Sequence, residues 1–313
     1  MRNGSITDIG TTMESYYGRP VIKEPVWQPE IPVYMFFGGL AGASSVLHGG
    51  ARLAGNDRLA RTSLFIGATG DLVSPLLLIS DLGRPERFLN MFRVFKPTSP
   101  MSVGSWILLL SGGASTTAAA LELLGKMPRL KAAAEAVSAL AGPPLATYTG
   151  TLVANTAVPV WHEGRHELPW LFAASASASA GAAAAMFTDL RSAGPGRRLA
   201  LIGAAGELGL MEAMKRRLGF VGEVYEQGAA GKLRRASKIC TAAGGVLLAR
   251  GGRRSRATAV AGGALVLAGG MALRWSVFRA GFQSARDPRY TVIPQRERKA
   301  ARQAESRPAS GRG

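Results

Sequence analysis

The chain has 313 residues, of which 47% are hydrophobic, and it carries a formal net charge of +18. In a soluble protein this excess of Lys and Arg would favour binding to nucleic acid. Here the basic residues lie in short connections and in the C-terminal tail, without a nucleic-acid-binding motif, so we expect no nucleic acid partner. The single cysteine, Cys240, excludes an internal disulfide and also an iron–sulfur cluster held by this chain alone, which needs about four ligands.

Long segments without charged residues are the strongest feature of the sequence. No Asp, Glu, Lys or Arg occurs in residues 31–51, 97–121, 136–161, 168–188 and 257–273. A helix crosses a hydrocarbon layer of ~30 Å with about 20 apolar residues. Segments such as "LPWLFAASASASAGAAAAMF" contain Ser, Ala and Gly instead of the polar stripe of a soluble helix. The pattern predicts an all-α polytopic membrane protein, with a soluble, Ala- and Gly-rich helical protein as the alternative.

The apolar segments predict about eight transmembrane helices in two four-helix bundles. The spans are about 31–53, 60–80, 101–124, 132–157, 167–188, 198–214, 234–250 and 256–279. The sixth and seventh spans contain charged residues, so an arrangement with six spans stays open. The resulting organisation is a polar N-terminal segment (1–30), a first bundle (31–157), a second bundle (158–279) and a basic tail without regular structure (280–313).

The distribution of basic residues predicts the orientation of the chain in the membrane. With eight spans both termini lie on one side, and the connections on that side carry more Lys and Arg than those opposite. The positive-inside rule then places both termini in the cytoplasm and the spans in the plasma (inner) membrane, although most of the difference comes from the tail. Residues 1–30 contain no apolar core of a cleavable signal peptide, so we expect the first span to direct insertion.

A charged stretch, "SDLGRPERFLNMFRVFKPTSP", separates the second and third spans at residues 80–100. Gly83 to Pro85 ends the span, and the apolar residues that follow lie among charges, as in a helix on a membrane surface. The mixture of Asp81, Arg84 and Arg87 favours a rim that binds a ligand or a partner. A solvated surface loop is the alternative.

The sequence resembles a known family in several long motifs. These are "DLGRPERFLNMFRVFKPTSPMSVGSW", "IPVYMFFGGLAG", "PPLATYTGTLVANTAVPVWHE", "GELGLMEAMKRRLG" and "GFQSARDPRYTV". They are similar to the NrfD/PsrC family, the quinone-reactive integral membrane subunits of molybdopterin oxidoreductase and related complexes. The resemblance implies a quinone or quinol ligand, menaquinone or ubiquinone, with no redox centre on this chain. It also implies a four-cluster iron–sulfur partner subunit and a molybdopterin catalytic subunit beyond it.

The histidine content agrees with the absence of haem. A haem b between helices needs two facing histidines, and only His48 lies in a predicted span.

The family resemblance suggests that Tyr148 donates a hydrogen bond to a quinone carbonyl. A phenol suits this role because its ring packs against the quinone and its hydroxyl donates. By counting spans, Tyr34 and the stretch with Asp81, Arg84 and Arg87 lie on the same side as the end of the fourth span, and we expect them to form the quinone pocket. His48 is a further candidate, or an interhelical histidine without a direct role.

Carboxylates within the spans are candidates for a proton path because charge is costly in hydrocarbon. These are Asp71, Glu207 and Glu212. Pairing with nearby basic residues is the structural alternative for the two glutamates. An ion or small-solute transporter that uses the same carboxylates is the alternative function.

The stretch "HEGRH", residues 162–166, satisfies the H-E-x-x-H pattern of zinc proteases, which requires both histidines on one helix. Gly164 and the nearby Pro169 disfavour that helix. We therefore expect a corner after the fourth span, with no metal site, and keep the protease as a third alternative.

Overall fold

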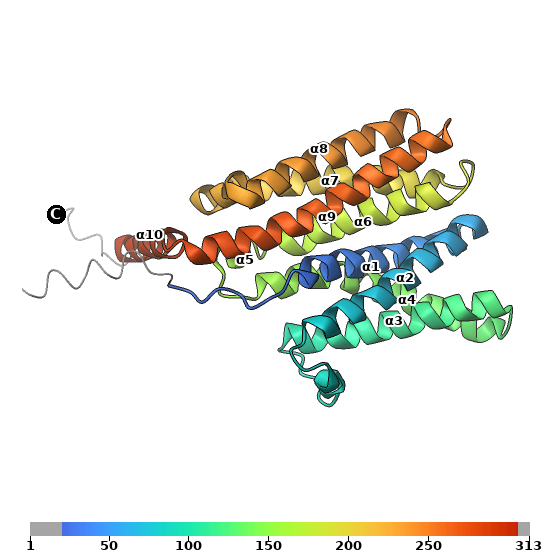
Figure 1. Cartoon of the computed structure of the whole chain (residues 1–313), viewed down its shortest axis with the longest axis horizontal. Coiled ribbons are helices and arrows are strands. Elements are labelled where there is room, and N and C mark those ends of the chain that lie inside the picture. Colours follow the sequence, from blue (N-terminus) through green and yellow to red (C-terminus); the bar gives the residue numbers. More distant parts are fainter. Residues whose placement is uncertain (1–20, 306–313) are drawn as a thin grey trace, which may run out of the picture.

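The computed structural model describes residues 21–305, and all regular secondary structure in this part of the chain is helical, with no strand. The expectations for residues 1–20 and 306–313 lie outside the described residues. Figure 1 shows the long helices side by side, with α1 to α4 in one group and α6 to α9 in the other. The predicted all-α fold class is confirmed.

The long helices of the described chain form two sets of four. The first set is α1 (Glu30–Leu53), α2 (Asp57–Asp81), α3 (Pro100–Leu124) and α4 (Pro128–Ala154). The second set is α6 (Leu168–Phe187), α7 (Gly194–Leu218), α8 (Gly228–Arg250) and α9 (Arg256–Arg286). Shorter elements connect or follow them: η3 (Pro85–Phe92), α5 (Pro159–Glu163), η4 (Gly219–Glu226) and α10 (Arg289–Glu305).

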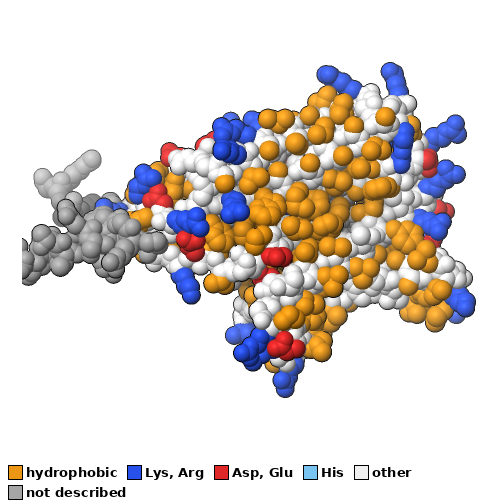
Figure 2. Space-filling view, in the orientation of Figure 1, with side chains coloured by type: hydrophobic (Ala, Val, Ile, Leu, Met, Phe, Trp, Pro, Cys, Tyr) orange, Lys and Arg blue, Asp and Glu red, His pale blue; other side chains and the backbone are white. Residues whose placement is uncertain are grey.

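Five helices of the described chain, α1, α2, α3, α6 and α9, are long and apolar enough to cross a membrane. The more polar α4, α7 and α8 pack beside them in the same bundles. Figure 2 shows hydrophobic side chains across the middle of the visible face, with Lys and Arg mainly toward the two ends. This distribution matches an apolar layer bounded by two aqueous surfaces.

Helix boundaries follow local capping signals. The Asn56 side chain accepts a hydrogen bond from the Leu59 amide at the start of α2, and Ser99 caps α3 in the same way. Pro100 stands in the first turn of α3, where its missing N–H removes no helical hydrogen bond. Gly125 ends α3 in the left-handed conformation that glycine adopts without strain.

Glycine pairs allow the helices within each bundle to pack closely. A Cβ atom on Gly42 of α1 would lie 2.6 Å from the carbonyl oxygen of Gly142 on α4. A Cβ atom on Gly244 of α8 would likewise lie 2.6 Å from the carbonyl oxygen of Gly262 on α9. Small residues drive such contacts in membranes, where lipid removes the hydrophobic advantage of larger side chains. The two bundles join where α6 contacts α1 and α4.

The described part of the N-terminal segment ties the two bundles together. The Gln28 amide donates to Asp81 at the end of α2, over 3.0 Å. Trp27 stacks on Trp161 of α5, with the ring centroids 5.2 Å apart. Glu24 accepts two hydrogen bonds from Arg286 at the end of α9. This segment is therefore a structural strap across one end of both bundles.

The C-terminal region differs from the tail without regular structure that the sequence analysis expects. Helix α9 continues to Arg286, and α10 follows over Arg289–Glu305. Tyr290 is buried and stacks on Phe220 of η4, with the centroids 5.1 Å apart. This anchoring contact joins residues far apart in sequence, so local apolar periodicity does not reveal it.

Candidate functional site

Two buried tyrosines from different helices meet at the strapped end of the first bundle. Tyr34 lies in the first turns of α1 and Tyr148 near the end of α4, and they are 1% and 7% exposed. Their hydroxyl groups are close enough to share one hydrogen bond, in which either phenol can donate. One of the two hydroxyl hydrogens is therefore left for another acceptor, and Tyr148 is the more exposed of the two residues.

Gly104 of α3 makes room for Tyr148. A Cβ atom at this position would overlap the phenol ring and hydroxyl of Tyr148. Apolar side chains complete the surroundings of the pair: Ile31, Met35, Leu108 and Leu145 belong to the same buried cluster. The phenol hydroxyl is thus a polar atom in an apolar setting, where a hydrogen bond is stronger than in water.

The charged stretch after α2 lies at the same end of the molecule, because it joins the end of α2 to the start of α3. Arg84 and Arg87 are exposed, and their side chains have no ion pair within residues 21–305. Asp81 does not pair with either arginine, since it accepts the Gln28 amide. In η3, Phe88 and Phe92 form an edge-to-face pair with centroids 5.3 Å apart. The arginines are therefore free to meet another surface.

His48 lies away from the two tyrosines. It is separated from Tyr34 by almost four helical turns of α1, a rise of about 21 Å. Its Nδ1 lies 2.8 Å from the carbonyl of Ala60, and its Nε2 lies 3.6 Å from Glu135. The structure thus places this candidate quinone residue in a polar cluster at the opposite end of the first bundle, with Arg52 also near Glu135.

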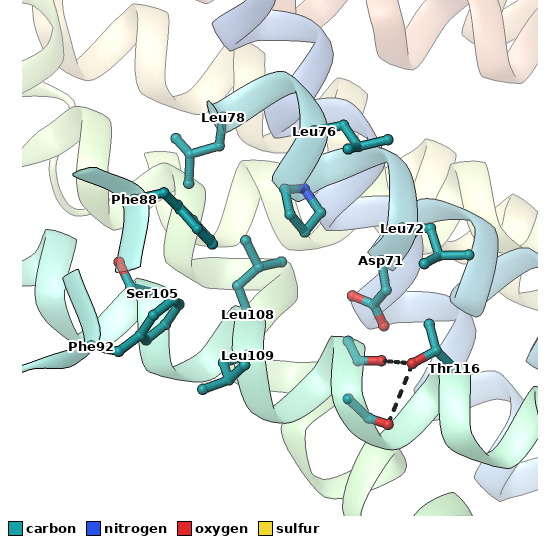
Figure 3. Close-up of a pocket in the computed structure, with 13 residues that line it drawn as sticks. Asp71, Leu72, Leu76, Leu78, Phe88, Phe92, Ser105, Leu108, Leu109 and Thr116 are labelled. Carbon is teal, nitrogen blue, oxygen red and sulfur yellow. Dashed lines mark hydrogen bonds between the residues drawn. The ribbon is translucent and has the colours of Figure 1, made fainter. Parts of the chain in front are cut away.

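Asp71 is buried between α2 and α3. Its Oδ2 accepts hydrogen bonds from Ser111 and Ser115, at 3.0 and 2.6 Å. Its Oδ1 has no hydrogen-bond partner in the described chain. Asp71 borders a largely apolar cavity of about 330 Å³ between α2, α3 and η3 (Figure 3). Leu78 and Leu108 line this cavity and also pack in the cluster that contains the two tyrosines, so the cavity adjoins the tyrosine pair.

Glu207 lies in the core of the second bundle and is 2% exposed. It accepts hydrogen bonds from Thr241 at 2.8 Å and from Ser237 at 3.4 Å, both on α8. A cavity of about 420 Å³ extends from Glu207 to Glu212 and Lys215 at the end of α7. Glu212 itself is paired with Lys215 and Arg216, as the structural alternative expects.

Arg274 of α9 is a buried charge that the sequence analysis did not single out. It is 1% exposed, and it donates to the Phe172 carbonyl at 2.9 Å while lying 3.9 Å from the centroid of the Phe172 ring. It also interacts electrostatically with Glu207. The sequence does contain a signal for this residue, a single arginine in "MALRWSVF" directly after a long uncharged segment. An arginine in this position is also typical of the end of a span, so the sequence alone does not mark it as buried.

The geometry disfavours the zinc-protease alternative. Helix α5 ends at Glu163, so His162 and His166 do not share a helix. Glu163 pairs with Arg298, at 2.6 Å, and Glu167 pairs with Arg217. Across residues 21–305 no group of three His, Cys, Asp or Glu side chains has the arrangement of a metal site.

Taken together, the apolar helices, the basic ends and the buried polar groups define an integral membrane protein with several spans. Residues 20–220 match the family model described as polysulphide reductase, NrfD, and the chain therefore belongs to this family. A search of curated proteins finds no match. Membership makes the chain a membrane subunit of an oxidoreductase complex.

Proposed function

We propose that this chain binds quinone or quinol, menaquinone or ubiquinone, at Tyr34 and Tyr148 and exchanges electrons with an iron–sulfur partner subunit. One observation carries the proposal: Tyr34 and Tyr148 meet in an apolar cluster, where a hydrogen bond between them leaves one hydroxyl hydrogen for a further acceptor. This arrangement fits the carbonyl oxygen of a quinone, which only accepts hydrogen bonds. The bound quinone would supply the redox chemistry, and Tyr148 would orient its ring.

The exposed arginines support a docking role for the same end of the molecule. Arg84 and Arg87 lie in the connection between α2 and α3, near the start of the helix that carries Gly104. A four-cluster iron–sulfur subunit seated there would lie close to the tyrosine pair, and a molybdopterin catalytic subunit would lie beyond it. Unpaired arginines also give an acidic partner charge-assisted hydrogen bonds.

The buried carboxylates extend the proposal to protons, which accompany electrons in quinone chemistry. The cavity that connects Glu207 with Glu212 leads from the core of the second bundle to the surface, and we propose it as one segment of a proton path. Asp71 is a separate candidate in the first bundle.

The test compares Tyr148→Phe with wild type in membranes that contain the native complex, at equal abundance of this chain. Loss of one hydrogen bond is expected to lower quinone-dependent kcat/KM by about tenfold. Reduction of an artificial dye by the catalytic subunit should stay unchanged. Tyr225→Phe is the matched control, because Tyr225 is a fully buried tyrosine in η4 of the other bundle. Unchanged quinone kinetics in Tyr148→Phe would contradict the site, and purification without any iron–sulfur subunit would favour the transporter alternative.

A further inference from the structure

The cavity of about 420 Å³ in the second bundle has a basic rim that the preceding proposals do not use. It lies between α7 and α8, at the end of the bundle where α7 ends and α8 begins. Both helices contribute cations to its lining: Lys215 and Arg216 from α7, and Arg234 and Lys238 from α8. The rim is therefore an electropositive gap between two helices of a membrane protein.

Three of these four cations are paired within the chain. Lys215 and Arg234 both contact the Glu226 carboxylate, at 2.7 and 2.6 Å. Arg216 contacts Glu212, at 3.2 Å. These ion pairs hold the rim in place, and they leave Lys238 as the lining cation without an ion pair in the described part of the chain.

Lys238 belongs to a row of unpaired cations on α8. Lys232 and Arg235 precede it at intervals of three residues, and all three side chains are exposed. None of them has an ion pair within residues 21–305. A spacing of three residues keeps neighbours on adjoining parts of the helix surface, and the row covers a rise of about 9 Å. This row is a concentration of positive charge that nothing else in the described chain neutralises.

The same side of α8 becomes apolar directly after this row. Ile239 and Val246 follow Lys232 by seven and fourteen residues, which is about two and four helical turns, and they are 67% and 48% exposed. On the neighbouring α9, the uncharged segment 257–273 ends at Leu273, which lines the cavity together with Lys238. Lys238 therefore lies where the apolar layer meets the aqueous surface, and Ile239 and Val246 extend from there into the layer.

We propose that this face of α8 and the basic rim of the cavity bind an anionic phospholipid. The phosphate contacts Lys238 and its neighbours in the row, and an acyl chain lies along Ile239 and Val246. Basic pockets between transmembrane helices are known to take phospholipid head groups. The site goes beyond the proposed function, because it requires neither a bound quinone nor proton transfer through Glu207.

The combination of charge and apolar surface favours a lipid over other anions. Free phosphate would use the cations, but it would gain nothing from Ile239 and Val246. An acidic protein surface would match the row of cations, but it would not extend into the hydrocarbon layer beside these two residues. A phospholipid has its charge at one end and its apolar part directly beyond it, in the same order as α8.

The experiment measures binding of phosphatidylglycerol to the full chain in detergent by native mass spectrometry, as the Kd of the first bound lipid. The triple variant Lys232→Gln, Arg235→Gln and Lys238→Gln should bind about tenfold more weakly or worse, because the phosphate loses its counter-charges. Its Tm in lipid-free detergent should equal that of wild type, since these side chains have no ion pair to lose. Wild type should bind zwitterionic phosphatidylcholine about tenfold more weakly than phosphatidylglycerol.

The matched control removes the same number of charges at the other end of α8. It is the triple variant Arg250→Gln, Arg253→Gln and Arg254→Gln, at three exposed arginines that do not line the cavity. This variant should bind the first phosphatidylglycerol like wild type. Equal weakening in both triple variants would overturn the inference, because it would show general attraction of anionic lipid to a basic chain.

Two further results would also overturn the inference. One is equal displacement of phosphatidylglycerol by inorganic phosphate and by unlabelled phosphatidylglycerol at the same concentration, which would make the site a phosphate site. The other is loss of the iron–sulfur subunit from the first triple variant with unchanged lipid binding, which would assign this face to a protein partner. Lipid binding that is retained in Tyr148→Phe, whatever happens to quinone kinetics, separates this site from the proposed function.

Discussion

The phenol of Tyr148 occupies the space that a side chain at Gly104 would need. A Cβ atom on Gly104 would overlap the ring and the hydroxyl of Tyr148, so the tyrosine reaches its position only because α3 has no side chain there. The two residues come from neighbouring helices of the first bundle, α3 and α4. The placement of the candidate hydrogen-bond donor therefore depends on a residue that has no polar group of its own.

Gly104→Ala is expected to displace Tyr148 and to lower quinone-dependent turnover at least as much as Tyr148→Phe, by about tenfold or more. Dye-linked activity of the catalytic subunit should remain, because the change lies in the membrane subunit. Steady-state kinetics with a short-chain quinol provide the measurement. The matched control is Gly209→Ala, where a Cβ atom meets nothing. Equal turnover of Gly104→Ala and wild type would show that the position of Tyr148 does not matter for quinone.

Arg84→Gln combined with Arg87→Gln is expected to weaken attachment of the iron–sulfur subunit. Exposed arginines without an internal partner contribute to docking through charge, so the difference from wild type should be largest at low ionic strength and should shrink as salt screens the charges. The measurement is the ratio of the two subunits after affinity purification in low and high salt. Arg250→Gln removes the same charge at the opposite end of the molecule and should leave the ratio unchanged. An unaffected ratio in the double variant would refute docking at this loop.

Arg274→Gln is expected to destabilise the chain by about 1–3 kcal/mol, because the buried Phe172 carbonyl loses its charged donor and Glu207 loses a favourable charge nearby. The double variant with Glu207→Gln should recover part of the loss, with a coupling energy of about 1 kcal/mol. Thermal unfolding of the four proteins in one detergent measures the cycle. Strictly additive effects would mean that the two side chains do not stabilise each other.

Asp189 connects the α6–α7 loop to the start of α2, and its stabilising effect should depend on pH. Hydrogen bonds from Arg58, at 3.1 Å, and from the Ser192 amide lower the pKa of Asp189 from 3.8 to about 2. A depressed pKa in the folded state stabilises the protein above the unfolded value, and this contribution is lost as the pH falls from about 4 to about 2.

Wild type should therefore have a higher Tm than Asp189→Asn at pH 6, where the stabilisation by the ionised Asp189 is complete. This difference in Tm should shrink toward zero near pH 2. Arg58→Gln removes the larger of the two causes of the lowered pKa, the hydrogen bond from Arg58. The Tm of this variant should therefore differ from that of wild type in the same direction as the Tm of Asp189→Asn, but by less. A difference in Tm that is constant across this range would exclude ionisation of Asp189 as its source.

Cysteine labelling tests the predicted orientation. In a Cys240→Ala background, Arg302→Cys reports on α10 and Lys126→Cys reports on the connection between α3 and α4. We expect a membrane-impermeant thiol reagent to reach Arg302→Cys from the cytoplasmic side and Lys126→Cys from the other side. The opposite pattern would reverse the orientation, and reaction of both from one side would contradict the odd number of spans between them, α4 and α6 to α9.

The helices were predictable because their signal is local. Uncharged segments long enough to cross hydrocarbon define α1, α3 and α6 directly, since each residue contributes to partition between water and lipid. The boundaries of α7 and α8 were harder, because their charges are compensated only after folding. Glu207 is one example, since it takes its donors from Ser237 and Thr241 of the next helix.

The candidate site was predictable only in part. Tyr148 and Tyr34 were named from the family resemblance and from span counting, and the structure brings them together. His48 was named on the same basis, but its place along α1 puts it near the other end of the bundle. Counting spans assigns a helix end to one side of the membrane, but it does not give the depth of a side chain or its direction around the helix.

By itself, the sequence determined that the protein is an all-α membrane protein of the NrfD family. The length of the apolar segments and the long family motifs can both be read directly from the order of the residues. The tertiary structure alone decided which polar groups meet. It paired Tyr34 with Tyr148 across α1 and α4, placed Arg274 against Phe172, and left one oxygen of Asp71 without a donor in the described chain, beside the cavity between α2 and α3. These contacts depend on the rotation of each helix about its axis and on how closely neighbouring helices pack. Both are determined by side chains that lie far apart in the sequence.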